Sequence, residues 1–568
     1  METTDKYSCQ VLADLLVAHG VEHVVLSPGS RDLPLMLAVH RTPRLKSTVV
    51  VDERVAAFVA LGMASVSGKP TAVVCTSGTA LLNYAPAVAE AYYRHIPMVV
   101  ISADRPYHWI DQDDSQTIRQ HGALEHIVKR SCDIPDARES GLDRWYAGRM
   151  INDALIEMQR GCPGPVHINI QLTEPLNGLA EKDGGQAARF IHYGAVQPMM
   201  MPDCLNEYAE KILHSPKVMI VAGFMSPELA LEVTRSLQVI EQLPNVVILT
   251  ESISNLKLSG AVQCIDMAVS GIPDSGKADF APDLLITVGG ALVSRFVKQF
   301  LRTNTPAEHW HIGHTRVLVD CMQAMTMHVD MSPDAFFSSL SALLEPEAVM
   351  HKGYATMWHD IYAAGLNWRD NFLSRCGWCD LEAFSLILPH IPEKCNLQLS
   401  NGTPIRYAQL MADMTHVNSV DCNRGVSGID GSTSTAVGAS MIYDGPTLLI
   451  TGDMSAQYDV GALALKQIPD RFRMIVINNG GGGIFRFIGS TSAVEEREQF
   501  FGEAVVNLPL QQLAEAYGFA YFVADDAAQL RRMLPLFFAS AGKSILEIRN
   551  LPQDQSAYHL RELLHMNK

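Results

Sequence analysis

Residues 474–485 read MIVINNGGGGIF, an apolar run that breaks into two asparagines and four consecutive glycines. The upstream stretch TLLITGD, residues 447–453, ends similarly in Gly452 and Asp453. Ligands of parallel sheets gather at the carboxyl ends of strands, where glycines let backbone amides approach a phosphate and side-chain oxygens suit Mg²⁺. The two stretches predict one strand-helix-strand unit with a diphosphate and metal site. The alternative is a flexible glycine loop and a helix cap at Asp453.

Size and charge limit the possible functions. With 568 residues the chain is too long for one core, and we expect about three domains. The net charge of -17, from 44 basic and 61 acidic residues, argues against a nucleic-acid or anionic-membrane partner. An anionic ligand must therefore be bound by locally placed arginines.

The cysteines and the N-terminal residues indicate in which cellular compartment the protein is expected. We interpret the eleven cysteines as scattered in apolar settings such as AVVCTSG and not grouped in C-x-x-C pairs, which predicts neither a disulfide framework nor a zinc site. The first residues, METTDKYSCQ, have no basic start followed by an apolar stretch, and no apolar run approaches the roughly 20 residues of a membrane helix. We expect a cytoplasmic protein without membrane insertion.

Short β-branched runs alternate with helical stretches, which predicts an α/β fold of parallel sheets. The expected strands fall in three blocks: HVVLSPG, STVVVDE, TAVVCTSG, MVVISAD and PVHINIQL; then KVMIVAG, NVVILTE and DLLITVGG; then NLQLSNG, TLLITGD, RMIVINNG and SILEIRN. Turn formers at 177–190 predict a linker, and helical spacing from 352 to 375 leads into the last block. We expect domains at 1–180, 190–345 and 350–568.

The G-D and N-N pairs at this spacing resemble the cofactor motif of the thiamin-diphosphate enzymes, although Met454 stands where the motif has a further glycine. The resemblance implies three doubly wound parallel-sheet domains: pyrimidine-binding, middle and diphosphate-binding. It also implies that Asp453, Asn479 and the Gly481 carbonyl bind Mg²⁺ or Mn²⁺. The further residues that it implies for binding thiamin diphosphate are Gly452, Ser455, Ile484 and Phe485.

Two further positions acquire a role from this resemblance. Glu53, in VVVDERVAAFVALGMA, follows a valine run and precedes a small-residue helix, where an acid is ordinarily a first-turn carboxylate. In the thiamin-diphosphate enzymes such a glutamate hydrogen-bonds the aminopyrimidine ring and assists removal of the C2 proton. Ile429, in NRGVSGIDG, would support the bent cofactor; without the other motifs it would be a buried isoleucine.

The stretches SPGSRDLPL, CTSGTALLNYAPAVAEA, SADRP, DSQTIRQ and SNGTPIR, together with NRGVSGIDG, resemble the 2-succinyl-5-enolpyruvyl-6-hydroxy-3-cyclohexene-1-carboxylate synthases of menaquinone biosynthesis. This family decarboxylates 2-oxoglutarate and adds the succinyl unit to isochorismate. The resemblance implies that isochorismate is bound by Ser30, Arg31, Arg105 and Gln116 and 2-oxoglutarate by Arg406 and Arg424, with Arg295 as a further basic residue.

The arginines support this assignment independently, because guanidinium groups bind carboxylates bidentately; a lone loop arginine is usually only a solvated surface residue. Two departures from the family pattern stand out. Gly402 occupies a position where the family often has serine, and Arg295 one where lysine is common.

The resemblance also implies an active site shared between two subunits, and so a homodimer or a dimer of dimers. Three alternatives remain. An acetohydroxyacid synthase or another 2-oxoacid decarboxylase would share Glu53 and the metal motif but would not need the first-domain arginines. A nicotinamide-dependent oxidoreductase would need a G-x-G-x-x-G motif at the start of the first strand-helix-strand unit, and the sequence has none there. A non-catalytic metabolite-binding regulatory protein could retain the fold. Whether residues 486–503 close over the site is left open.

Overall fold

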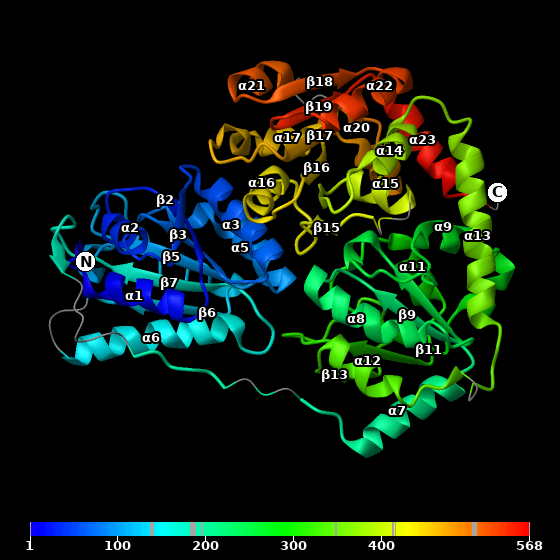
Figure 1. The fold of residues 1–568 in the computed structure, drawn as a ribbon, viewed down its shortest axis with the longest axis horizontal. Coiled ribbons are helices and arrows are strands. Elements are labelled where there is room, and N and C mark those ends of the chain that lie inside the picture. Colours follow the sequence, from blue (N-terminus) through cyan, green and yellow to red (C-terminus); the bar gives the residue numbers. More distant parts are fainter. Residues whose placement is uncertain are drawn as a thin grey trace. The chain divides into compact units, whose positions relative to one another are not determined.

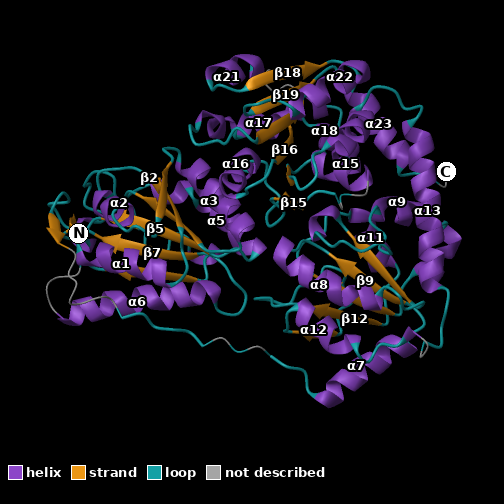
Figure 2. Cartoon of the chain, viewed as in Figure 1, coloured by secondary structure: helices purple, strands orange, loops and turns teal. Residues whose placement is uncertain are grey.

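The structure is a computed structural model that describes residues 2–136, 141–181, 189–194, 196, 198–346, 349–411, 414, 416–501 and 508–566. Helices alternate with strands along this length (Figure 2). Three all-parallel sheets of six, five and six strands form, together with one small antiparallel pair. The predicted α/β class with parallel sheets is therefore confirmed.

The N-terminal sheet has the strand order β3-β2-β4-β5-β7-β6. Its strands are β2 (His23–Ser27), β3 (Lys46–Val49), β4 (Thr71–Cys75), β5 (Met98–Asp104), β6 (Arg130–Ile134) and β7 (Val166–Gln171). Its helices are α1 (Tyr7–Ala18), α2 (Leu33–His40), α3 (Glu53–Ser67), α4 (Ala80–Asn83), α5 (Ala85–Arg94) and α6 (Gly141–Gln159). Alternate strand residues such as Val24 and Leu26 share one core with α1, α2 and α6. The opposite face is covered by α3 (Figure 1).

The middle sheet has the order β10-β9-β11-β12-β13. Its strands are β9 (Val218–Ala222), β10 (Val246–Thr250), β11 (Leu284–Val288), β12 (Glu308–Ile312) and β13 (Met327–Val329). One face packs on α7 (Pro202–His214), α8 (Pro227–Ile240) and α12 (Pro333–Ser341). The other face packs on α9 (Ile265–Gly271), α11 (Arg295–Thr303) and α13 (Tyr354–Leu373). A short helix, α10 (Lys277–Phe280), precedes β11.

The C-terminal sheet has the order β15-β14-β16-β17-β19-β18. Its strands are β14 (Asn396–Leu399), β15 (Ser419–Cys422), β16 (Thr447–Gly452), β17 (Phe472–Ile477), β18 (Ala520–Ala524) and β19 (Ser544–Ile548). One face packs on α14 (Asp380–Ile387), α15 (Pro404–Met411), α22 (Ala527–Phe538) and α23 (Gln553–Leu563). The remaining helices are α16 (Ser432–Ile442), α17 (Asp453–Tyr458), α18 (Gly483–Phe487), α19 (Gly489–Ser492), α20 (Arg497–Phe501) and α21 (Leu510–Ala516). Because the sheet is parallel, β14, β15, β16 and β17 all present their carboxyl ends at one edge.

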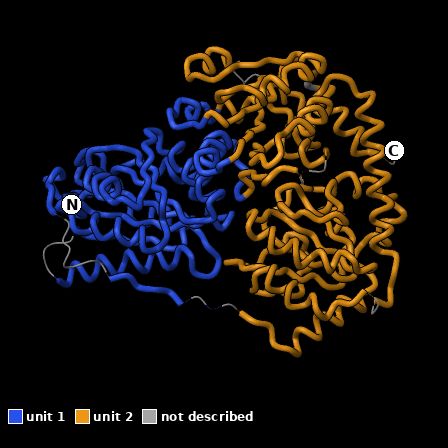
Figure 3. The backbone as a smooth tube through the Cα atoms, in the orientation of Figure 1, with its two compact units in different colours: residues 1–196, 425–444, 458–469 blue, residues 197–424, 445–457, 470–568 orange. Residues whose placement is uncertain are grey.

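The chain forms two compact units that do not follow sequence order (Figure 3). The first comprises residues 1–196, 425–444 and 458–469, and the second contains the remainder. Within the first unit α16 lies directly on α3: a Cβ added to Gly62 would fall 2.0 Å from the Thr435 carbonyl oxygen, and one added to Gly438 2.0 Å from that of Val59. Backbone-to-backbone contact between the two helices therefore depends on these glycines.

The segment 177–190, which the sequence predicts to be a linker, contains a short strand in the structure. Residues 179–181 form β8 (Leu179–Glu181), which pairs antiparallel with β1 (Glu2–Thr4), while residues 182–188 lie outside the described part. The helix predicted from 352 to 375 is α13. Along the described residues, no helix is both long and apolar enough to cross a membrane.

Candidate functional site

Glu53 is the first residue of α3, in the first unit. The preceding Asp52 caps the helix by accepting a hydrogen bond from the Val55 amide at 3.2 Å. The following Arg54 donates to the Tyr458 carbonyl at 3.1 Å and lies 3.9 Å from buried Asp459. These contacts fix the start of the helix. The Glu53 carboxylate itself remains half-exposed and accepts a hydrogen bond from the side-chain amide of Asn83 at 3.4 Å.

The residues predicted to bind isochorismate gather at the carboxyl edge of the N-terminal sheet. Buried Arg31 donates to the Leu172 carbonyl and to Glu174, both at 3.1 Å. Arg105, directly after β5, forms an ion pair with Asp114 at 2.6 Å. Gln116 has a left-handed backbone (φ 57) and donates to the Ser77 carbonyl at 3.1 Å. Exposed Ser30 follows β2.

Two buried carboxyls at this edge were not identified from the sequence. Burial raises the pKa of Asp32 to about 7, although the Gly29 amide donates to it at 2.8 Å. Burial likewise raises the pKa of Asp104 to about 6, against hydrogen bonds from the Asn169 side chain and the Arg105 amide. Each stands beside a predicted substrate arginine in the sequence. Burial of an acid at a strand end, such as Asp104, or in the loop after one, such as Asp32, has no distinctive sequence pattern, which is why both were missed.

The second unit holds the predicted metal and diphosphate residues. Asp453 is buried at the end of β16, and its carboxylate accepts from the Gly481 amide and from the Met454 amide, both at 2.7 Å. Burial raises the pKa of Asp453. The strand pair β16 and β17 therefore brings Gly452, Asp453 and Gly481 together as the sequence predicts.

The glycine run has a conformational cause. Gly480, Gly481 and Gly482 have φ values of 75, 85 and 61, in the left-handed region that side chains other than glycine rarely adopt. A Cβ on Gly482 would also lie 2.7 Å from the Phe501 carbonyl oxygen. The run is therefore a tight backbone turn, in which the Gly481 amide donates to Asp453, and such glycine turns suit anion binding.

Asn479 is oriented by a residue that sequence reasoning missed. Its side-chain nitrogen donates at 3.1 Å to Asp380, the first residue of α14. Burial raises the pKa of Asp380 as well, although hydrogen bonds with the Ser556 and Asn479 side chains oppose this effect. Two buried acids, Asp380 and Asp453, thus lie near one amide side chain. Such an excess of buried negative charge fits a cation.

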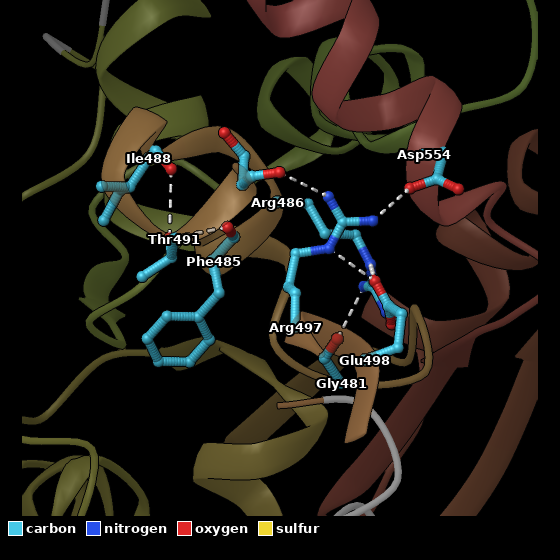
Figure 4. A network of polar contacts seen from close by, with 9 residues as sticks. Gly481, Phe485, Arg486, Ile488, Thr491, Arg497, Glu498 and Asp554 are labelled. Carbon is cyan, nitrogen blue, oxygen red and sulfur yellow. Dashed lines mark hydrogen bonds and ion pairs between the residues drawn. The ribbon is translucent and has the colours of Figure 1, made fainter. Parts of the chain in front are cut away.

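The Gly481 carbonyl, the third predicted metal ligand, accepts a hydrogen bond from Arg486 at 2.7 Å (Figure 4). Arg486 is itself buried and forms an ion pair with Glu498 at 2.7 Å, and Arg497 joins Glu498 to Asp554. A metal at the Gly481 carbonyl would meet this guanidinium. The donor set thus fits a divalent ion if the Arg486 side chain shares or leaves that oxygen. Within the described part of the chain no group of three or more His, Cys, Asp or Glu side chains could hold a metal, and the predicted set does not need one.

Arg295, Arg406 and Arg424, which are predicted to bind substrate, lie close enough in the second unit for their charges to affect the pKa of Arg406. Burial lowers the pKa of Arg406 to about 10, and the positive charges of Arg424 and Arg295 add to this effect. Arg424 donates to the Asn401 side chain at 3.0 Å, and Arg406 to the Gly402 carbonyl. Gly402, with φ 96, occupies a conformation that favours glycine over the serine common in the family. The cluster is a cationic site suited to a carboxylate.

Two buried acids that were not predicted from the sequence, Glu251 and Asp266, contact the chain just before Arg295. Both oxygens of fully buried Glu251 accept backbone amides, from Val293 and Ser294, at 2.7 Å. Ser294 caps α11, so Glu251 fixes the loop that leads to Arg295. Asp266 accepts from the Ser294 hydroxyl. These contacts hold the N-terminus of α11 in place.

The remaining predicted cofactor residues are located as follows. Ile429 is half-buried between β15 and α16, in the first unit. Ser455 is buried in α17. Ile484 and Phe485 lie in α18, and Phe485 stacks on Phe501 at 4.0 Å between ring centroids. Of the segment 486–503, residues 486–501 form α18 to α20 and their connections, whereas 502 and 503 lie outside the described part.

The parallel sheets, the acid that begins α3, and the aspartate and glycine turn at β16 and β17 are the features expected of a thiamin-diphosphate enzyme. A family model described as "Thiamine pyrophosphate enzyme, N-terminal TPP binding domain" matches residues 8–124.

Full-length relatives narrow this class. A protein of Porphyromonas gingivalis is 41% identical over 563 residues, covering 98% of this chain and 96% of its own length. A protein of Flavobacterium johnsoniae is 38% identical, covering 95% of both chains. A third, from Desulfotalea psychrophila, is 35% identical, covering 90% of this chain and 92% of its own. Each is named 2-succinyl-5-enolpyruvyl-6-hydroxy-3-cyclohexene-1-carboxylate synthase. The chain belongs to this family.

Proposed function

We propose that the protein decarboxylates 2-oxoglutarate with thiamin diphosphate and joins the resulting succinyl unit to isochorismate. The observation that carries this proposal is the cationic cluster of Arg406 and Arg424, which follow β14 and β15 of the sheet that also holds Asp453, together with Arg295 at the start of α11. A 2-oxoacid with a second, distal carboxylate matches such a cluster, whereas pyruvate has no group for it.

When bound, thiamin diphosphate supplies the electron sink for loss of carbon dioxide. The residues of the chain do the rest. Asp453, Asn479 and Gly481 would hold Mg²⁺ or Mn²⁺ and, through it, the diphosphate, with the glycine amides completing the turn. Glu53, half-exposed at the start of α3, would accept or donate the proton exchanged with the aminopyrimidine ring. Arg406 and Arg424 would orient the donor, and Arg31, Arg105, Gln116 and Ser30 the acceptor.

We propose that two copies of the chain assemble, as a dimer or a dimer of dimers. Apolar side chains beside Glu53 support a partner surface, since Val51 is 78% exposed and Leu82 44% exposed. Sedimentation of the purified protein tests this, and a monomer with full activity would contradict it. We also propose a cytoplasmic location, in keeping with eleven cysteines that form no disulfide among the described residues.

The activity test uses purified protein with thiamin diphosphate, Mg²⁺, 2-oxoglutarate and isochorismate, and follows isochorismate consumption. Omission of each component and replacement of 2-oxoglutarate by pyruvate are the controls. Consumption that proceeds equally well with pyruvate would favour an acetohydroxyacid synthase or another 2-oxoacid decarboxylase. Cofactor binding without turnover of any donor would favour a non-catalytic regulatory protein.

A further inference from the structure

Two cysteines lie together on the turn that connects α13 to α14. The sequence Cys376-Gly377-Trp378-Cys379 is a C-x-x-C motif, which our interpretation of the cysteines as scattered overlooked. Gly377 has φ 69, so the turn doubles back and brings the two sulfurs to 3.8 Å, with the Cys379 thiol donating to Cys376. The other cysteines have no such neighbour in the sequence.

A metal site does not account for the pair. The part of the chain that the structure describes has no group of three or more His, Cys, Asp or Glu side chains that could bind a metal, and structural zinc takes four ligands. A disulfide needs a sulfur separation of about 2.05 Å, so the sulfurs must approach by a little under 2 Å. The neighbouring Ser374, Arg375 and Gly377 are exposed, so the turn has room to make this adjustment.

The two thiols differ in their environments. The hydrogen bond from Cys379 lowers the pKa of Cys376, and the same bond together with burial raises the pKa of Cys379. Cys376 retains 5% exposure whereas Cys379 is fully buried. Cys376 is thus the thiol that an oxidant meets first, and Cys379 is positioned to resolve the product.

The turn is joined to the predicted metal and diphosphate site. Asp380 follows Cys379 directly, and its carboxylate holds the Asn479 side chain at 3.1 Å. The Asp380 amide donates to the Ser556 hydroxyl at 3.1 Å, and Trp378 donates to the Arg549 carbonyl at 3.3 Å. Because Cys379 and Asp380 share a peptide bond, a displacement of Cys379 also moves Asp380, the residue that orients Asn479.

We propose that Cys376 and Cys379 form a reversible disulfide, a redox modification site that controls how firmly Asp380 holds Asn479. With a hydroperoxide as oxidant, the Cys376 sulfur attacks the peroxide oxygen, the O–O bond breaks, and a sulfenic acid and one water (or alcohol) form. The Cys379 sulfur then attacks the Cys376 sulfur, forming the S–S bond and releasing the hydroxyl as a second water. Both thiol protons end in these products, and the two thiols supply the two electrons that reduce the peroxide. A dithiol reductant reverses the reaction by exchange.

The test uses the full-length protein with Cys204 and Cys321, the two cysteines that are not buried, replaced by serine. After treatment with hydrogen peroxide, remaining thiols are alkylated and the protein is digested without reduction. We expect a peptide bridged between Cys376 and Cys379, lighter by two hydrogen atoms, that dithiothreitol restores. Cys264→Ser, which removes a buried thiol of the same hydrophobic core, is the matched control and should leave the bridge intact.

Cys379→Ser should instead trap a sulfenic acid at Cys376 that dimedone labels. Both thiols free after oxidation, or Cys376 converted directly to the sulfinic acid in the parent protein, would overturn the pair as a redox site. Because the bridged peptide is read from the parent protein, this conclusion does not depend on whether a serine variant folds.

The link to Asn479 has its own measurement. Hydrogen exchange of the peptide that contains residues 478–483 should quicken by about threefold or more on oxidation and return on reduction. In Cys379→Ser the same treatment should leave this exchange unchanged. A bridge that forms without any change in exchange would overturn the control of Asn479. Neither measurement requires catalytic activity, so the result is independent of the proposed function.

Discussion

Replacing Arg406 by glutamine tests the cationic cluster directly. The pKa of this guanidinium falls from its ordinary value of 12.5 to about 10, which corresponds to about 3 kcal/mol of unfavourable interaction for the charged group in the empty cluster. A charge-assisted hydrogen bond contributes about 1.5 to 3 kcal/mol, so the expected loss on Arg406→Gln is about 10- to 150-fold.

The assay is calorimetric binding of glutarate, an unreactive dicarboxylate, to protein saturated with thiamin diphosphate and Mg²⁺. Arg302→Gln is the matched control, because Arg302 lies on the same helix as Arg295 but bonds the Cys321 carbonyl at 2.7 Å. It should change glutarate affinity by less than about twofold, within the range of a screened surface charge. Equal losses in the two variants, or unchanged affinity in Arg406→Gln at an unchanged melting temperature, would refute the assignment of the cluster to the distal carboxylate.

Four further substitutions test the rest of the site and its support. Glu53→Gln should keep the circular dichroism spectrum and lower turnover by about 100-fold or more, the usual scale of acid-base assistance; wild-type turnover would remove Glu53 from the mechanism. Asp453→Ala should abolish thiamin-diphosphate binding at ordinary Mg²⁺ concentrations, since it removes an anionic ligand and the acceptor of the Gly481 amide; unchanged affinity by calorimetry would contradict the metal site. Arg105→Ala should raise the KM for isochorismate by about 10- to 150-fold while carbon dioxide release from 2-oxoglutarate without acceptor changes much less. Gly438→Ala should lower the free energy of unfolding by about 1 to 3 kcal/mol, because its Cβ would meet the Val59 carbonyl.

The sequence predicted most strands, including the edge strands β3 and β10, and missed several others, most of which lie at sheet edges. All twelve predicted strand runs correspond to strands, among them β4, β9 and β16, whose continuous apolar runs reflect burial on both faces. Of the missed strands, β6, β13, β15 and β18 are sheet edges, and β12 is next to an edge. The sequences of the missed edge strands β6 and β15, RSCDI and SVDC, carry polar residues that interrupt the apolar pattern, although every residue of β15 is buried.

A similar limit applies to the site. Strand ends with glycine, aspartate or arginine are visible in a sequence, because the residue type itself indicates the chemistry. Residues that act on those groups from elsewhere in the chain are not: Asp380 is 99 positions from Asn479, and Glu251 is 42 from Val293. Their roles arise from tertiary contact alone. The resemblance supplied most of the site residues, and the roles of those residues stay predictions.

The direct contact of α3 with α16 has a consequence for how the chain folds during synthesis. Helix α3 is buried from Val55 to Ala64, and part of what covers it lies at residues 425–444. When the first 196 residues have emerged from the ribosome, the segments 425–444 and 458–469, which complete the first unit, have not yet been synthesised. Until then the small-residue face of α3 is exposed, in a state prone to association with other chains. Expression of residues 1–196 alone should yield an aggregating fragment, and a separately added peptide spanning 425–469 should improve its solubility.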